Sequence, residues 1–160
     1  MAEQPSEGAG RPALAVADTV IVSAILVGTQ RVREAELLRR YDVHLRGKSL
    51  VLSFATVSEL RYGSLKGEWT SARRQRMEDW FSQVATIVMP DNDLVNVCAG
   101  LRDICQRNGH ALGGKIHDSD RWIASTAIRY GIPLISDDGI FRNVPGLTLL
   151  QEQADQTARS

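Results

Sequence analysis

Short apolar runs alternate along this chain with longer segments whose apolar residues recur at helical spacing, and this alternation limits the folds that are open to it. Strands are predicted at residues 13–17, 50–54, 86–89, 134–135 and 147–150. Helices are predicted at residues 20–26, 32–45, 71–84, 94–107 and 120–130, with a short one from Thr56 to Gly63 or Gly67. Strands that alternate with helices are typical of an α/β domain built on a parallel sheet.

The length of the chain agrees with one domain. A sequence of 160 residues is long enough to bury a core, and it contains no internal repeat or linker that would divide it. We therefore expect a single domain over residues 13–150, between flexible tails at residues 1–12 and 151–160. No run approaches the roughly 20 apolar residues of a membrane span, and the first residues lack the basic and apolar parts of a signal peptide. No association with a membrane is expected.

Charge and cysteine usage narrow the classes of function. Lys plus Arg and Asp plus Glu balance at 19 each, so nucleic acid would have to bind through a local patch rather than through an overall field. Cys98 and Cys105 are seven residues apart on one predicted helix. They are thus about 10 Å apart along its axis, beyond the roughly 7 Å over which two Cα atoms can be bridged. They are interpreted as buried thiols of a reduced, cytoplasmic protein.

Four carboxylates each lie where an apolar run gives way to a helix start. Asp18 follows the first run, Glu59 the second and Asp138 the run at 134–135, whereas Asp120 opens a predicted helix. If the runs are parallel strands, all four acids lie at the carboxyl edge of one sheet, where open α/β sheets bind ligands. Two carboxylates about 4 Å apart repel by roughly 4 kcal/mol at an effective dielectric constant near 20. Such a cluster predicts a bound cation.

The types of ligand atom indicate which cation this is. Oxygen ligands without a cluster of Cys or His suit Mg²⁺ or Mn²⁺, and such ions act on phosphate groups. Thr19, beside Asp18, and Ser136, two residues before Asp138, add hydroxyl groups at the same edge. These hydroxyls are expected to support the acids by hydrogen bonds.

Each acid also has a purely structural interpretation. Asp18 can cap a helix, and Glu59 can complete a capping box with Thr56. Asp120 suits the positive end of a helix, and Asp138 lies in an Asp-Asp-Gly segment of turn-like composition. Four separate caps have no reason to favour the same edge of a sheet, so the shared edge favours a functional site.

Several segments together resemble a PIN domain, and more narrowly the VapC-type toxins of bacterial toxin–antitoxin pairs. They are residues 18–23, 58–63, 120–124 with Ala127, and 136–141 followed by 144–147. The resemblance spans residues 14–150 and implies a three-layer α/β fold around a mainly parallel sheet. It also implies a metal-dependent endoribonuclease whose acidic quartet is Asp18, Glu59, Asp120 and Asp138.

The resemblance implies partners as well: a small antitoxin protein, an RNA substrate such as tRNA or rRNA, and a second copy of the chain in a homodimer. Two features depart from the family pattern. Val20 stands where such proteins often carry Asn after Asp-Thr. In addition, Asp118 and Asp137 are rivals for the positions assigned to Asp120 and Asp138, because they lie one or two residues away.

Basic residues near the predicted site are candidates for RNA contact, since binding of RNA to a net-neutral chain requires such a patch. The candidates are Arg61, Lys66, Arg121 and Arg142. A further group, Arg73, Arg74 and Arg76, lies on the predicted helix at 71–84. A solvated helix face is the structural alternative for that group.

Two other functions stay open at this point. One is a non-catalytic module of the same fold that only sequesters RNA or a protein partner. The other is a haloacid-dehalogenase-type phosphatase, because Asp118-Ser-Asp120 resembles its Asp-x-Asp motif, although that motif follows the first strand in those enzymes. Residues 109–115 match the start of a phosphate-binding P-loop. Ile116 replaces the magnesium-binding Ser or Thr, however, and the segment follows a helix, so nucleotide binding is not expected there.

Overall fold

The computed structural model describes residues 13–152, and the tails predicted at residues 1–12 and beyond 152 lie outside the described residues. The strands are β1 (Ala13–Ala17), β2 (Lys48–Ser53), β3 (Ala85–Val88), β4 (Leu134–Ile135) and β5 (Leu149–Leu150). The α-helices are α1 (Thr19–Val27), α2 (Val32–Leu45), α3 (Phe54–Lys66), α4 (Ser71–Val84), α5 (Asn92–Arg107) and α6 (Asp118–Tyr130). Short 3-10 helices lie at η1 (Gly28–Gln30), η2 (Ala111–Gly113), η3 (Lys115–His117) and η4 (Gly139–Phe141).

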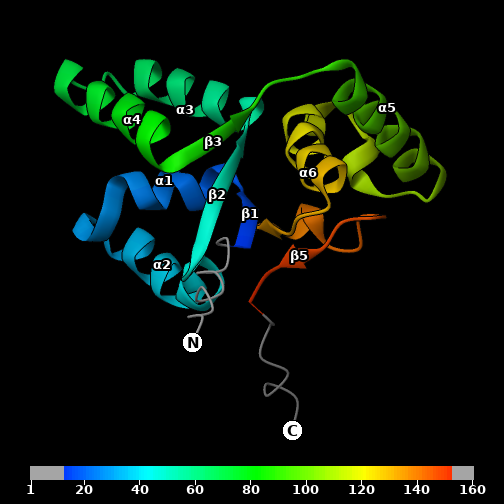
Figure 1. Cartoon of the computed structure of the whole chain (residues 1–160), viewed down its shortest axis with the longest axis horizontal. Coiled ribbons are helices and arrows are strands. Elements are labelled where there is room, and N and C mark those ends of the chain that lie inside the picture. Colours follow the sequence, from blue (N-terminus) through cyan, green and yellow to red (C-terminus); the bar gives the residue numbers. More distant parts are fainter. Residues whose placement is uncertain (1–12, 153–160) are drawn as a thin grey trace, which may run out of the picture.

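The strands form one five-stranded sheet in the order β3-β2-β1-β4-β5, and every neighbouring pair is parallel. Strand β1 is central: its residue Val16 pairs with Val51 of β2 on one side and with Leu134 of β4 on the other. Figure 1 shows helices α1 to α4 on one side of the sheet and α5 with α6 on the other. The predicted three-layer α/β fold with a parallel sheet is confirmed.

Alternation along the strands divides the core between the two faces of the sheet, as the two-residue repeat of a strand requires. Ala15 and Ala17 of β1 pack into one buried cluster, with side chains of α1 to α4. Val16, between them, packs into the other cluster, with side chains of α5 and α6. Strand β1 is apolar on both faces and ends at Ala17, and the first polar side chain, that of Asp18, directly follows it.

The helix after β2 begins earlier than predicted. Helix α3 starts at Phe54, and its N-cap is Ser53, whose Oγ accepts the backbone N–H of Ala55 at 3.3 Å. The predicted capping box of Thr56 and Glu59 is therefore wrong, because Thr56 already lies in the first turn of the helix. Glu59 lies in the second turn, where it has no capping role to perform.

The last α-helix also differs from the prediction at its start but not at its end. It begins at Asp118 rather than at Asp120, so both acids lie in its first turn. It ends at Gly131, which adopts the left-handed backbone conformation with φ of 62°. The last helical residue is thus Tyr130, as predicted, and glycine adopts the conformation that follows it without steric cost.

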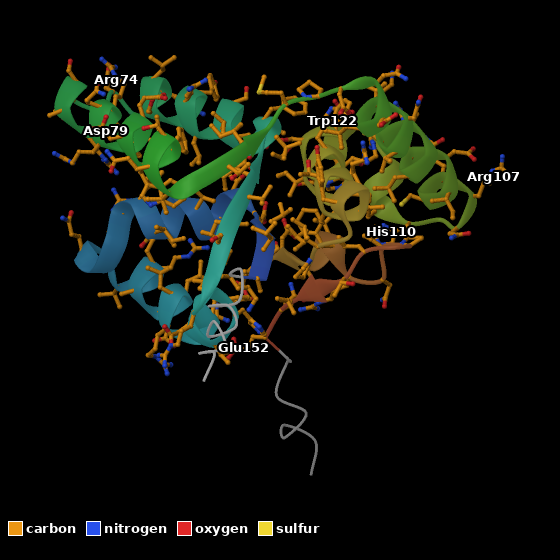
Figure 2. The ribbon with its side chains drawn as sticks, viewed as in Figure 1. Arg74, Asp79, Arg107, His110, Trp122 and Glu152 are labelled. Carbon is orange, nitrogen blue, oxygen red and sulfur yellow. The ribbon has the colours of Figure 1, made fainter. Side chains whose placement is uncertain are left out.

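Two residues that the sequence assigns to the C-terminal tail are bonded to the domain. The Nε2 of Gln151 donates to the carbonyl of Ser136 at 3.1 Å, and Glu152 forms a 2.6 Å ion pair with Arg40. Figure 2 shows Glu152 beside α2 at the lower edge of the sheet. The contacts of the domain therefore continue to Glu152.

Two further predictions concern the thiols and membranes. Cys98 and Cys105 are both buried and unbridged on α5, as predicted. Within residues 13–152, no helix combines the length and the apolar character that crossing a membrane requires.

Candidate active site

The carboxyl ends of β1, β2 and β4 lie at one edge of the sheet, and the first turn of helix α6 approaches the same edge. Asp18 directly follows β1, and Ser136 directly follows β4. Helix α3 starts at the end of β2 and carries Glu59, and it packs on α6, which carries Asp120. The parallel topology therefore explains why acids far apart in the sequence come to one place.

Asp18 is the buried centre of this edge, with 3% of its surface exposed. Its Oδ1 accepts the backbone N–H of Thr19 at 2.7 Å, which makes it the N-cap of α1 as well. Its Oδ2 accepts the hydroxyl of Ser136 at 2.7 Å. The capping interpretation is therefore confirmed, and it does not exclude the predicted site role, because capping uses only one of the two carboxylate oxygens.

The electrostatic environment of Asp18 is unfavourable to its charge. Burial raises the pKa of this carboxyl from 3.8 to about 6, and the nearby charges of Asp120 and Asp138 add to the shift. The hydrogen bonds from Ser136 and Thr19 oppose it. Three of the four predicted acids are therefore close enough to interact electrostatically, around a carboxylate that water does not stabilise.

Asp138 is joined to Asp18 through Ser136. The backbone N–H of Asp138 donates to Oγ of Ser136 at 3.0 Å, while the same oxygen donates its hydrogen to Asp18. Asp138 is exposed, and its Oδ1 caps η4 by accepting the backbone N–H of Ile140 at 2.9 Å. One carboxylate oxygen of Asp138 therefore accepts a hydrogen bond within its own turn.

Glu59 and Asp120 are held by neighbours at the start of α6. The hydroxyl of Ser119 donates to Oε1 of Glu59 across the α3–α6 contact. Nδ1 of His117 lies 2.9 Å from Oδ2 of Asp120. Ser119 and His117 were not among the predicted site residues. A signal for them existed in their position beside Asp118 and Asp120, but sequence alone does not show which helix α6 faces.

The rival acids have other partners. Asp118 lies 2.6 Å from the guanidinium of Arg121, and its side chain is 66% exposed. Asp137 accepts from the hydroxyl of Tyr41 at 2.8 Å and from Arg40 at 3.2 Å. Both rivals thus contribute to the scaffold, and these contacts support Asp120 and Asp138 as the members of the site.

The candidates for RNA contact differ in their availability. Arg121 is only 1% exposed, and its guanidinium donates to the carbonyls of Leu112 and Gly114 at 2.8 Å each. It is therefore not accessible to an RNA backbone, and the predicted contact of Arg121 with RNA is wrong. Those carbonyls belong to residues 109–115, the segment that resembles a P-loop, and they are hydrogen-bonded to Arg121.

The remaining three candidates lie at the surface. Arg61 is paired with Glu78 at 2.8 Å, so a bound phosphate would compete with that carboxylate. Arg142 donates from Nε to Gln151 at 2.6 Å and is exposed. Lys66 is exposed at the C-terminal end of α3. Arg61, Lys66 and Arg142 therefore stay predictions.

The donor set fits a hard divalent cation. Its atoms are carboxylate and hydroxyl oxygens, and the charge of Asp18 is disfavoured by burial and by two like charges that a cation would neutralise. Among residues 13–152, however, no three His, Cys, Asp or Glu side chains are already grouped as a metal site requires. Glu59 instead has a hydrogen-bond partner on α6, Ser119, and Asp120 has one in η3, His117.

Comparisons with known proteins identify the family of this chain. The PIN domain family matches residues 15–147 of the chain. The chain is 28% identical over 136 residues to Ribonuclease VapC5 of Mycobacterium tuberculosis, a stretch that covers 84% of this chain and 90% of that protein. Ribonucleases of this family generally depend on a divalent metal ion.

Solved structures share the fold. VapBC2 from Rickettsia felis, bound to a DNA fragment of its promoter, matches with a TM-score of 0.66 and 18% identity over 88% of this chain and 99% of the matched one. VapBC-5 from Mycobacterium tuberculosis matches with a TM-score of 0.56 and 24% identity over 89% of this chain and 100% of the matched one. The family match spans most of the sequence and includes all four acids, Asp18, Glu59, Asp120 and Asp138. The chain belongs to the PIN domain family.

Proposed function

We propose that this protein is a metal-dependent endoribonuclease that acts as the toxin of a toxin–antitoxin pair. The observation that carries the proposal is the buried carboxylate of Asp18 at the carboxyl edge of the sheet, whose pKa is raised in part by Asp120 and Asp138. A ribonuclease relative and structural neighbours that are VapBC toxin–antitoxin complexes support the same activity and an antitoxin partner.

The acids have separate roles in this proposal. Asp18 and Asp120 would hold a divalent ion, Mg²⁺ or Mn²⁺, directly or through water, and Glu59 and Asp138 would complete its surroundings. When bound, such an ion supplies Lewis acidity toward a phosphodiester and neutralises part of its charge. Ser136 and Thr19 orient Asp18 through the hydrogen bonds already described, so that its carboxylate does not rotate away from the edge.

The substrate is RNA whose backbone is accessible, in single strands or loops. In-line attack by water on a phosphodiester should leave a 5′-phosphate and a 3′-hydroxyl, whereas attack by the ribose 2′-hydroxyl leaves a 2′,3′-cyclic phosphate. The chemistry of the cut ends therefore tests the proposed reaction directly. An RNA such as tRNA or rRNA, a cytoplasmic location and a homodimer are further parts of this proposal.

The test is cleavage of total cellular RNA by the purified chain, with mapping of the cut ends. Cleavage is expected with Mg²⁺ or Mn²⁺ and should disappear with EDTA. Asp120→Asn should abolish cleavage while folding is retained, and Asp118→Asn is the matched control, because it removes one charge two residues away on the same helix. Activity that survives Asp120→Asn but not Asp118→Asn would exchange the two assignments.

The same experiment separates the alternatives. A non-catalytic binding module predicts that Asp120→Asn leaves growth inhibition in cells unchanged, and that no cut ends appear. Cut ends that carry a 2′,3′-cyclic phosphate would contradict the reaction proposed. The phosphatase alternative is wrong, because the chain belongs to the PIN domain family and Asp118-Ser-Asp120 opens α6 rather than following β1.

A further inference from the structure

A cavity of about 350 Å³ lies between the C-terminal half of α1 and helix α4, away from the acids, and three arginines line it. They are Arg31, Arg73 and Arg76. Within residues 13–152 none of the three forms a salt bridge, in contrast to Arg39, Arg40 and Arg61, which all do. Like charges that gather without a carboxylate are unfavourable unless an anion joins them, so the cavity has the charge of an anion site.

The arginines are close enough to disturb one another. The pKa of Arg73 is lowered, first by burial and then by the charges of Arg31 and Arg76. The guanidinium of Arg73 lies over the ring of Trp69, 3.5 Å from its centroid. A cation thus lies over the face of an indole, and nucleobases stack on such aromatic and guanidinium groups in complexes with RNA.

Trp69 is held in this position by the turn between α3 and α4. Its backbone N–H donates to the carbonyl of Ser64 at 3.0 Å. Gly67 lies against the ring so closely that a Cβ there would be 3.1 Å from Nε1 of Trp69 and 3.0 Å from the carbonyl of Gly63. A second indole, Trp80, also lines the cavity and contacts Phe81 edge to face. The aromatic wall is therefore part of the folded scaffold.

Helix α1 connects this cavity to the acids. Asp18 caps its start, whereas Ile25, Leu26 and Val27 near its end line the cavity, about 10 Å further along the axis. A second cavity, of about 320 Å³, is lined by Thr19 and Ser23 of α1 and by Arg33 and Arg40 of α2. Its α1 residues lie between Asp18 and the residues that line the first cavity. Ser23 and Val27 are one helical turn apart on the same stripe of α1, so the two cavities follow one side of the helix.

We propose that the cavity at Trp69 and Arg73 binds a nucleotide of single-stranded RNA that flanks the cleaved bond. A base would stack on the Arg73–Trp69 pair, and Arg31 and Arg76 would contact adjacent phosphates. Base stacking and phosphate contacts together are the means by which proteins hold single strands without reading their sequence. The inference rests on the proposed ribonuclease function, because RNA is the substrate assigned to the acidic edge.

The charges and the contact between Arg73 and Trp69 favour RNA over an acidic protein segment. An acidic peptide would pair with the arginines but would make no use of a guanidinium that lies over an indole. The chain as a whole is neutral, with 19 basic and 19 acidic residues, so RNA has no overall field to attract it and depends on local unpaired cations such as these. Arg121 is buried and Arg61 is paired with Glu78. The cluster at the cavity, in contrast, has guanidinium groups that form no salt bridge among the described residues and can bind a phosphate.

The test is binding of a fluorescein-labelled single-stranded RNA of about ten nucleotides, measured by anisotropy. The full chain carries Asp120→Asn so that the RNA is not cut. The double substitution Arg73→Ala with Arg76→Ala should weaken binding by about tenfold or more. The slope of log K against log salt should fall by about 0.7, since the phosphate contact of Arg76 is lost and each such contact accounts for about 0.7 in single strands. Trp69→Leu should weaken binding by about tenfold with little change of slope, because stacking is lost and charge is kept.

Arg74→Ala is the matched control. Arg74 lies on α4 between the two tested arginines, does not line the cavity, and is seen on the outer part of that helix in Figure 2. It should change the affinity by about threefold or less. Thermal unfolding of each variant establishes that the fold is retained. A double variant that binds RNA like its parent, or an Arg74→Ala variant that loses as much affinity as the double variant, would overturn the inference.

Two further outcomes separate this inference from others. If RNA binding is unchanged but a coexpressed antitoxin no longer inhibits the variants, the cavity is a protein-binding site and the RNA assignment is wrong. If the wild-type chain cuts RNA and the cavity substitutions change neither RNA binding nor, with Asp120 intact, cleavage, the proposed function stands and the inference fails. If RNA binds through the cavity but the chain cuts nothing, the inference stands and the proposed function fails.

Discussion

The hydroxyl of Ser136 donates a 2.7 Å hydrogen bond to Oδ2 of Asp18, although 118 positions separate the two residues. Both are buried, and they directly follow the adjacent parallel strands β4 and β1. The same oxygen accepts the backbone N–H of Asp138 at 3.0 Å. A single hydroxyl group therefore fixes the central carboxylate and the turn that carries another acid.

Ser136→Ala should destabilise the fold at neutral pH. The buried carboxylate of Asp18 loses a donor, and the amide of Asp138 loses its acceptor, so the free energy of unfolding should fall by about 1–3 kcal/mol. Urea denaturation measures this change. Ser82→Ala is the matched control, because the exposed hydroxyl of Ser82 only donates to a carbonyl of its own helix, at 3.0 Å. Equal losses in the two variants would show that the Ser136 bond has no special weight.

The stability of the metal-free protein should fall as the pH rises from about 4 to about 6. The pKa of Asp18 is raised in the folded state, from 3.8 to about 6, so the folded state holds a proton there that the unfolded chain has already released. Ionising Asp18 in the fold then costs up to about 3 kcal/mol at neutral pH. Asp18→Asn should remove this loss, since Asn keeps the shape and can still cap α1.

Chemical denaturation in EDTA at about pH 4 and about pH 7.5 checks this prediction. The Asn variant should exceed the wild type in stability at the higher pH and approach it at the lower one. Mg²⁺ or Mn²⁺ should then raise the stability of the wild type near pH 7.5, because binding to the folded state alone is stabilising, and should do so less in the variant. A wild-type stability that rises with pH over this range contradicts the prediction.

Arg121→Ala should act on folding rather than on RNA affinity. The buried guanidinium bridges the carbonyls of Leu112 and Gly114, so its removal leaves acceptors without a donor and opens a cavity beside α6. A loss of about 3 kcal/mol in the free energy of unfolding is expected. Arg142→Ala, which removes an exposed arginine, is the comparison and should cost about 0.5 kcal/mol or less. A stable Arg121→Ala variant with weakened RNA binding would restore the phosphate-contact interpretation.

Two glycines should respond to alanine in opposite directions. A Cβ at Gly113 would lie 2.8 Å from Cγ and 2.9 Å from the backbone nitrogen of Gln106, and the backbone atom cannot move aside freely. Gly113→Ala should therefore cost about 1–3 kcal/mol. Gly100 lies in the middle of α5 with nothing within 4 Å of a Cβ, so Gly100→Ala should stabilise by up to about 1 kcal/mol. Thermal melts of the two variants decide whether both signs are right.

The parts of the site that follow strands were predictable because parallel topology determines where a strand ends. Asp18 and Ser136 meet for that reason, and no further information was needed to expect them at one edge. The alternation of apolar runs and helices likewise predicted the sheet, because apolar strands with two covered faces occur in this architecture. Errors at helix starts, as at Phe54 and Asp118, arose where the capping residue was not the expected one.

Long-range side-chain contacts were not predictable. Nothing in the sequence near Asp137 shows that Tyr41 and Arg40, almost a hundred residues earlier, form hydrogen bonds with its carboxylate. Arg121 seemed available because its helix also carries Asp120, yet its burial depends on how residues 111–117 fold over it. Such facts follow from packing between elements, which periodicity along one element does not describe.

The acids of the candidate site span positions 18 to 138, and they meet only where strands from both halves of the chain lie side by side. If all four acids are needed for cleavage, as proposed, a nascent chain on the ribosome is inactive until it has passed position 138. In a protein proposed to cleave RNA, this arrangement makes activity depend on completed synthesis and folding of the whole domain.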